Sequence, residues 1–199
     1  MFALETLKKG IERMTGIGRQ SSASLRRFIQ RRKAHTVWLG DDGTIPNNSH
    51  LPLVYYRSPV HLTRALDPAA VLEQLFGSNG WTDSWRDSIY DYAHFHSGTH
   101  EVLGIARGRA RVRFGGRIGK VIELRAGDVA ILPAGTGHQR LSGSHDLLVV
   151  GAYPPGGHYD ECRGSLKQRE RARASIPRVP LPPRDPVYGA HGPLLDFWR

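Results

Sequence analysis

The spacing of apolar residues along this chain changes near residue 34. Before that point, apolar side chains recur at the spacing of one helix face, at Leu4, Leu7, Ile11 and Met14. A break at GIGRQ follows, and the next run, SASLRRFIQRR, predicts a second short helix that Ser22 or Ser24 could cap. The first part of the chain is therefore expected to be helical.

From residue 35 onward the apolar runs are short and of β type. They read HTVWL, PLVYYR, IYDYAHFH, EVLGIA, RARVRF, KVIEL, DVAILP and LLVVGAY, with turn signals such as DDG, GG and AGTG between them. One helix, DPAAVLEQLF, interrupts them, and it opens with Asp67 and with Pro68 at its first position. Many short strands at regular spacing predict an antiparallel sandwich or barrel.

The two ends of the chain carry its positive charge. Residues 1–33 hold nine lysines and arginines against two glutamates, and residues 163–199 hold eight against three acidic residues. The part between them holds eleven against thirteen, so the net charge of +10 belongs to the ends. We expect a basic helical arm over 1–33, a barrel domain over 34–162, and a basic, proline-rich extension over 163–199. The end of that extension, IPRVPLPPRDPVYGAHGPLLDFW, is too rich in proline for a helix or strand, and its large apolar residues should hold it against the body.

Composition narrows the class of protein further. The length of 199 residues suits one domain with extensions, and 23 glycines with 13 prolines suit a turn-rich globular protein. A single cysteine, Cys162, excludes an internal disulfide, and no apolar run approaches the roughly 20 residues of a membrane helix. Charged residues interrupt the first 14 positions, unlike a secretory signal. We therefore expect a cytoplasmic protein without a membrane span.

The basic ends raise the question of a nucleic-acid partner. Phe2 and Phe28 are the only aromatic residues of the first 33, whereas grooves for single-stranded nucleic acid interleave aromatic and basic side chains. The middle of the chain is slightly acidic, so the basic ends can dock on it or on a second subunit. We favour that docking over nucleic-acid binding.

The run HFHSGTHE gathers three histidines and a glutamate within eight residues. If IYDYAHFH is a strand, His94 and His96 point to the same face, and their imidazoles can converge on one atom. In the next strand, alternation turns Glu101 inward with apolar neighbours and turns His100 away from it. Downstream, the run GDVAILPAGTGH carries a strand into a turn that delivers His138.

Three neutral imidazoles and one carboxylate are typical ligands of a divalent transition metal such as Fe, Mn, Ni, Cu or Zn. An inward-facing Glu101 without a cation beside it would be costly to bury. One such ion is therefore predicted at His94, His96, Glu101 and His138, and a metal-free pocket is the alternative.

These residues also carry a family resemblance. HFHSGTHEVLGIARG resembles the first cupin motif, HxH(x)4E(x)6G, and GDVAILPAGTGH resembles the second, G(x)5PxGxxH. The glycine that usually opens the first motif falls on Ser88, and the asparagine that often closes the second falls on Ser142; neither position is a metal ligand. The wider layout is similar to a group of uncharacterised bacterial single-domain cupins.

The resemblance implies an all-β fold, an antiparallel double-stranded β-helix or jelly-roll barrel, with short N-terminal helices and an extended C-terminal segment. It implies a metal at the centre of the barrel but no particular reaction, because cupins include dioxygenases, isomerases, epimerases, sugar-binding proteins and storage proteins. A metalloenzyme with dioxygenase-type chemistry on a small organic substrate is the leading hypothesis. A non-catalytic small-molecule or metal-dependent binding protein is the alternative.

Four further residues are candidates for the pocket. Tyr90 and Tyr92 share the strand face of the histidines, as pocket walls or acid–base groups, although core packing is the simpler expectation. His100 is expected beside the ligands or on the surface rather than as a ligand. Arg140 shares a strand face with His138 and could reach the mouth of the pocket, although an ordinary surface arginine is the simpler expectation.

Assembly can be predicted from strand edges. The runs HTVWL and PLVYYR precede the motifs, and unpaired edge strands tend to pair across a two-fold axis. We therefore expect a homodimer.

Overall fold

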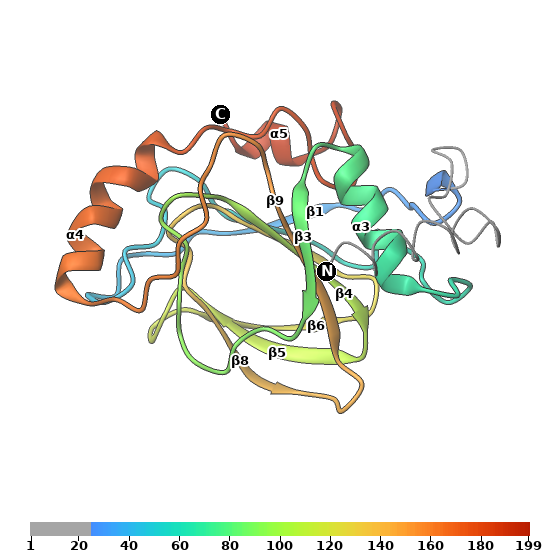
Figure 1. The fold of residues 1–199 in the computed structure, drawn as a ribbon, viewed down its shortest axis with the longest axis horizontal. Coiled ribbons are helices and arrows are strands. Elements are labelled where there is room, and N and C mark those ends of the chain that lie inside the picture. The colour runs from blue at the N-terminus through green and yellow to red at the C-terminus, as the bar shows by residue number, and fades with distance from the viewer. Residues whose placement is uncertain (1–24) are drawn as a thin grey trace, which may run out of the picture.

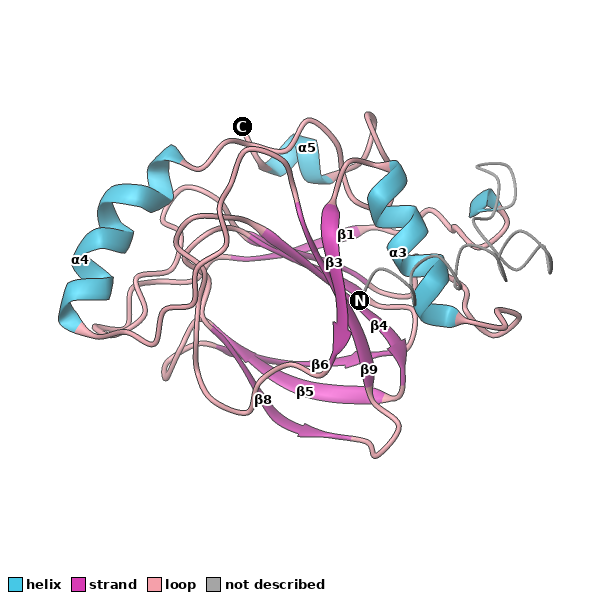
Figure 2. Cartoon of the chain, in the orientation of Figure 1, coloured by secondary structure: helices cyan, strands magenta, loops and turns pink. Residues whose placement is uncertain are grey.

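Two antiparallel sheets form the centre of the computed structural model, which describes residues 25–199 (Figures 1 and 2). The larger sheet has the order β1 (Ala34–Val37), β2 (Leu53–Tyr56), β7 (Val129–Leu132), β4 (Glu101–Arg107), β9 (Leu148–Tyr153) and β3 (Thr82–Asp87). The smaller sheet has the order β6 (Lys120–Arg125), β5 (Arg109–Phe114) and β8 (His138–Gly143). All strand pairs in these sheets are antiparallel, so the predicted all-β jelly-roll class is confirmed.

Both faces of the larger sheet are buried at its inner strand β4. Leu103 and Ile105 point inward and pack against β5 and β6 of the smaller sheet. Val102 and Ala106 point to the opposite face and pack beneath helix α3. Glu101 has the parity of Leu103, so it faces the interior of the barrel, as alternation predicts.

Helix α3 (Pro68–Ser78) covers the outer face of the larger sheet (Figure 1). The side chain of Asp67 caps it by accepting hydrogen bonds from the amides of Ala69 and Ala70, each at 3.1 Å. Leu72 and Phe76 are fully buried against the sheet. The helix predicted from DPAAVLEQLF is therefore confirmed.

The C-terminal part contains helical segments that the sequence pattern did not predict. They are α4 (Leu166–Ser175), the 3₁₀ helix η1 (Ile176–Arg178) and α5 (Leu194–Phe197). The expectation that the proline-rich tail forms no helix is thus wrong over η1 and α5. Pro177 and Pro193 stand at the starts of these helices, where the first turn does not need the amide hydrogen that proline lacks. Helix α4 buries only Ala172, so it has no apolar stripe that a period could reveal.

Large apolar residues near the C-terminus pack on the outer face of the larger sheet. Val187, Leu194 and Trp198 are buried in the same cluster as α3. The indole nitrogen of Trp198 donates to the carbonyl oxygen of Pro52 at 2.9 Å. These contacts place the end of the chain beside β2.

The predicted helix over Leu4, Leu7, Ile11 and Met14 lies outside the described residues, as do its neighbours Ser22 and Ser24. Among the described residues of the second predicted helix, Leu25 and Arg26 are helical and residues 27–32 are not, so that prediction is wrong over 27–32. From Phe28 onward, backbone pairing with a distant segment replaces it. The amide of His61 donates to the carbonyl oxygen of Phe28 at 2.7 Å.

Two strand predictions also differ from the structure. The run IYDYAHFH is not a regular strand, because only His94 and Phe95 make isolated bridges, to His138 and Cys162. Strand β3, TDSWRD, was not predicted because most of its residues are polar and exposed at the sheet edge. Within residues 25–199 no helix is long and apolar enough to cross a membrane.

Candidate metal centre

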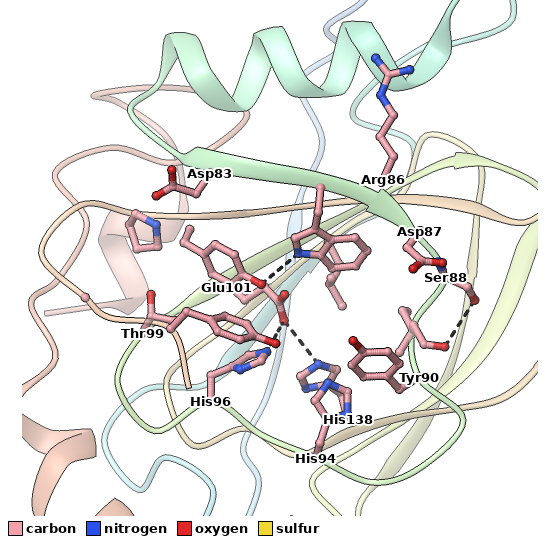
Figure 3. Close-up of a pocket in the computed structure, with 17 residues that line it drawn as sticks. Asp83, Arg86, Asp87, Ser88, Tyr90, His94, His96, Thr99, Glu101 and His138 are labelled. Carbon is pink, nitrogen blue, oxygen red and sulfur yellow. Dashed lines mark hydrogen bonds and ion pairs between the residues drawn. The ribbon is translucent and has the colours of Figure 1, made fainter. Parts of the chain in front are cut away.

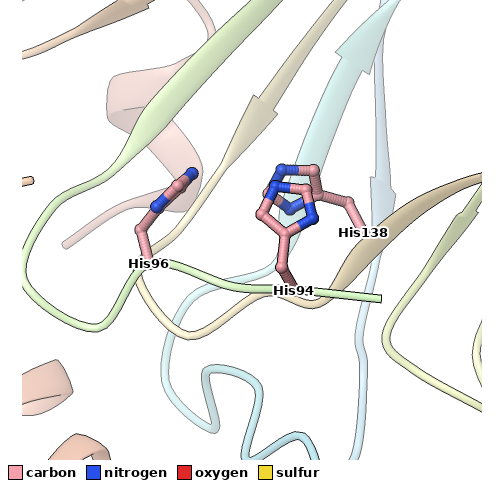
Figure 4. A group of neighbouring side chains, drawn as sticks. All are labelled: His94, His96 and His138. Atoms are coloured by element: carbon pink, nitrogen blue, oxygen red, sulfur yellow. The ribbon is translucent and has the colours of Figure 1, made fainter. Parts of the chain in front are cut away.

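Three buried histidines meet between the two sheets (Figure 4). His94 and His96 lie on the segment between β3 and β4, and His138 is the first residue of β8. The backbones of His94 and His138 form an isolated antiparallel bridge, with hydrogen bonds of 3.2 and 2.9 Å. This bridge brings the two motifs together, and one potential ligand atom from each histidine lies within 4.8 Å of the others. The three side chains could therefore bind a metal ion.

Backbone carbonyl groups orient all three imidazoles. The Nδ1 atom of His94 lies 3.3 Å from the carbonyl oxygen of Tyr92, and that of His138 lies 3.1 Å from the carbonyl oxygen of Thr136. The Nδ1 atom of His96 lies 2.5 Å from the carbonyl oxygen of Asp160. A carbonyl can only accept, so each Nδ1 carries a hydrogen, and in the neutral form of each imidazole the Nε2 atom keeps a free lone pair.

Glu101 supplies a carboxylate beside these lone pairs. Its Oε2 atom lies 3.5 Å from Nε2 of His96 and 3.4 Å from Nε2 of His138, as the dashed lines in Figure 3 indicate. This oxygen is fully buried and has no hydrogen-bond partner among the described residues. A buried carboxylate oxygen without a donor is costly, and a cation between it and the imidazoles would remove that cost. The donor set therefore fits a divalent transition metal.

Electrostatics around the four side chains agree with that fit. Burial raises the pKa of Glu101, but the nearby histidines, His96 first, outweigh it and hold the pKa at about 2. Burial and the neighbouring His94 lower the pKa of His138 to about 3, and burial also lowers the pKa of His94. Burial would likewise lower the pKa of His96, but Glu101 and the Asp160 carbonyl raise it overall. The site thus holds an ionised carboxylate and at least two neutral imidazoles near neutral pH.

A cavity of about 510 Å³ opens above the four side chains (Figure 3). Its walls are aromatic, with Trp85, Tyr90, Tyr153 and Tyr159 among the lining residues. The indole nitrogen of Trp85 donates to the hydroxyl oxygen of Tyr153 at 2.9 Å. Burial and the nearby Glu101 raise the pKa of Tyr153, so this phenol keeps its proton.

The structure revises the expectations for the tyrosines. Tyr90 lines the cavity but is 43% exposed, and Tyr92 is half-buried, so the expectation of core packing is wrong for both. Their segment is irregular, and strand parity does not apply to it. The two rings stack with centroids 4.8 Å apart, and Tyr92 donates to Glu161 at 3.2 Å. Tyr90 therefore remains a wall residue, whereas Tyr92 does not line the cavity.

His100 and Arg140 have structural contacts. His100 is fully buried, its Nδ1 accepts the amide hydrogen of Ala134 at 2.9 Å, and its ring packs on Trp198. It is therefore neither a surface residue nor one of the clustered histidines. The Nε atom of Arg140 donates to the carbonyl oxygen of Ile89 at 2.9 Å, and this bond holds the backbone ahead of His94. Arg140 is half-buried and does not line the cavity.

Sequence reasoning missed the contribution of residues 153–160. Tyr153 and Tyr159 supply part of the cavity wall, and the Asp160 backbone orients His96. Only the aromatic and acidic character of GAYPPGGHYDEC signals this role, because the segment has no regular period. Trp85 was missed together with strand β3.

Comparisons with known proteins give one close relative by sequence. The uncharacterised protein YjlB of Bacillus subtilis is 41% identical over 167 residues, which span 84% of this chain and 98% of that protein. No family model matches the chain.

Among solved structures, the similarities are partial. The TDP-fucose-3,4-ketoisomerase WlaRA of Campylobacter jejuni has a TM-score of 0.37 at 13% identity, covering 46% of this chain and 74% of that chain. The acireductone dioxygenase of Bacillus anthracis, with a cadmium ion in its active centre, has a TM-score of 0.34 at 18% identity. That match covers 48% of this chain and 68% of the dioxygenase.

Proposed function

Because this chain belongs to the same family as YjlB of Bacillus subtilis and carries two motifs that resemble those of cupins, we propose that it is a metal-dependent enzyme acting on a small organic molecule. Dioxygenase-type oxidation is the favoured reaction, by analogy with other cupins. We further propose that His94, His96, Glu101 and His138 hold one divalent transition metal.

One observation carries the proposal. The buried Oε2 of Glu101 has no hydrogen-bond donor among the described residues and faces Nε2 of His96 and of His138 at 3.5 and 3.4 Å. Carbonyl acceptors at all three Nδ1 atoms place the hydrogen of each neutral imidazole on Nδ1, so that its Nε2 lone pair can coordinate. This arrangement supports an ion at the centre better than it supports a metal-free pocket.

A bound divalent metal would supply Lewis acidity and, in the case of iron, manganese or copper, redox chemistry. The chain's own residues would orient the substrate. Tyr90 and Tyr159 offer flat apolar faces at the cavity wall. Tyr153 accepts a hydrogen bond from Trp85, and its hydroxyl lies near enough to the Glu101 carboxylate to interact with it, so this phenol stands between the ligand set and the cavity wall. The aromatic wall would also limit the access of water to the reacting atoms.

A non-catalytic, metal-dependent binding protein is the second candidate. The same ligands and the same cavity would serve it, since binding requires no turnover. We propose a cytoplasmic homodimer, with the three-part division 1–33, 34–162 and 163–199.

Metal identity and oxygen consumption distinguish the two candidates. The untagged protein would be purified, its metals measured by elemental analysis, and a second sample loaded with Fe(II) without oxygen. We expect substrate-dependent oxygen uptake by the iron-loaded protein when a metabolite panel is added in air. Zinc as the only native metal, with no oxygen uptake, would favour isomerisation, hydrolysis or plain binding.

A further inference from the structure

The charge distribution of the cavity wall restricts what the cavity can accept. Apart from the histidines, Arg86 is the only basic residue among the described residues that line it. All three guanidinium nitrogens of Arg86 are already engaged, by Glu73 at 2.6 and 2.7 Å and by Asp67 at 2.9 Å. Figure 3 shows Arg86 pointing away from the histidines and toward the helix above. No described lining residue is therefore a free cation.

Carboxylates occupy the rim instead. Asp83 and Asp87, both exposed residues of β3, line the cavity on the side of the aromatic wall (Figure 3). Asp83 has a φ of 51°, in the left-handed region, at the β-bulge between Thr82 and Trp85. A bulge redirects side chains from their regular alternation. If one anionic group of a ligand binds at the histidine cluster, the carboxylates of Asp83 and Asp87 therefore repel any second anionic group of the same ligand.

The centre itself can satisfy one anionic group. A divalent ion beside the single carboxylate of Glu101 leaves a net charge of about +1, which one ionised hydroxyl would neutralise. Beyond it lie the aromatic rings, with those of Tyr153 and Tyr159 5.5 Å apart and edge to face. Such walls bind flat apolar bodies by stacking and by excluding water.

We propose that the cavity selects a planar molecule with one metal-chelating hydroxyl group or pair of hydroxyls, such as an aromatic diol or an enediol, and with an otherwise uncharged body. Phosphorylated, sulfonated and dicarboxylate compounds are rejected by Asp83 and Asp87. This selection rests on the proposed function, because the chelating end needs the metal.

Binding of two matched probes to the full-length, zinc-loaded protein tests the selection. Zinc is redox-inert, so catechol is not oxidised by the metal during the titration. Catechol and catechol-4-sulfonate present the same diol and differ by one fixed negative charge. Calorimetry should give at least about tenfold tighter binding of catechol, from repulsion at the rim. Sulfonation acidifies the diol, so the metal alone would bind catechol-4-sulfonate more tightly than catechol. Tighter binding of catechol is therefore the opposite of what the metal alone would give.

Variants separate the contributions of the rim and the wall. In an Asp83→Asn/Asp87→Asn double variant, the preference for catechol should fall toward one, whereas the exposed control Asp146→Asn should keep it. Tyr159→Ala should weaken catechol binding several-fold without changing zinc content.

Zinc content, measured on the same samples, shows which idea fails. Without bound zinc, the proposed function is wrong and the selection is wrong with it. With zinc bound, equal or tighter binding of the sulfonate by the unmodified protein would overturn the selection alone. A preference that survives unchanged in the double variant would do the same.

Discussion

The backbone carbonyl oxygen of Asp160 lies 2.5 Å from Nδ1 of His96, although 64 residues separate the two positions in sequence. The carboxylate of Asp160 holds this contact in place. Its Oδ1 accepts from the amides of Ser97 and Gly98 at 2.7 and 3.1 Å, and its Oδ2 accepts from the Ser97 hydroxyl at 2.6 Å. Asp160 is therefore a positioning residue for the proposed metal ligand.

Replacing Asp160 should weaken metal binding without removing a ligand. We expect Asp160→Ala to lower zinc affinity by about 10- to 100-fold, the usual range for groups that orient a ligating histidine. A chelator competition assay measures this change, with circular dichroism to check folding. The exposed Asp146→Ala is the control, and equal affinities in both variants would contradict the positioning role.

The meeting of the four proposed ligands was predictable, but the residues that support them were not. The two motifs fix His94, His96, Glu101 and His138 by spacing, and the inward face of Glu101 follows from strand alternation. Asp160 comes from an irregular segment whose place is set by tertiary hydrogen bonds, so no period in the sequence reveals it.

The fold likewise contains elements that the sequence pattern predicts and others that only tertiary contacts define. Helix α3 was predictable because it combines a capping Asp67 with an apolar face. Helix α4 was not, because tertiary ion pairs and a Ser165–Gln168 capping box, rather than an apolar stripe, hold it. Strand β3 is an edge strand with polar, exposed residues, so only its pairing with β9 defines it.

Removing two proposed ligands should abolish metal binding. In a His96→Ala/His138→Ala double variant, elemental analysis should find less than about one tenth of the metal bound by the unmodified protein, which should hold one ion per chain. The double variant His50→Ala/His145→Ala removes two exposed histidines and should keep its metal. Unchanged metal content in the first variant would show that the ion binds elsewhere.

Gly151 gives Trp85 the space that it needs in the cavity wall. A Cβ atom at position 151 would lie 2.1–2.3 Å from atoms of the indole ring. Gly151→Ala should therefore displace Trp85, break its hydrogen bond to Tyr153, and cost about 1–3 kcal/mol of stability, as overpacking does. Tryptophan fluorescence and denaturant unfolding measure the two effects. Gly77→Ala, where a Cβ meets nothing within 4 Å, is the control and should leave the fluorescence unchanged.

Asp41 links helix α4 to the loop after β1, and this contact should depend on pH. Arg169 donates to both carboxylate oxygens, at 2.7 and 2.8 Å, and Arg173 donates at 2.7 Å. The Arg169 hydrogen bond is the main cause that holds the pKa of Asp41 well below its usual range. A depressed carboxylate pKa stabilises the folded state at pH values above the unfolded pKa, about 3.9, and this stabilisation is lost as pH falls through the folded value.

Asp41→Asn should therefore lower the free energy of unfolding by about 1 kcal/mol at pH 7, since the ion pairs are partly exposed. The difference from the unmodified protein should shrink below about pH 4. Urea unfolding at several pH values measures it, with Glu170→Gln, an exposed position on the same helix, as control. A difference that stays constant down to pH 2 would argue against this contact as its cause.

The free edge of β1 should pair with a second copy of the chain. Among the described strands, β1 pairs only with β2, and the next residue, Trp38, is 63% exposed. Ile118 is 69% exposed and lines the same shallow hollow as Trp38. An unpaired edge beside exposed apolar side chains is prone to pair with another strand, and a two-fold axis closes such pairing into a dimer.

Light scattering at micromolar concentration should thus give twice the monomer mass, and Trp38→Asp should give the monomer. Leu66→Asp, at a 97% exposed position that belongs neither to β1 nor to this hollow, should remain dimeric; a monomer mass for the unmodified protein would refute the prediction.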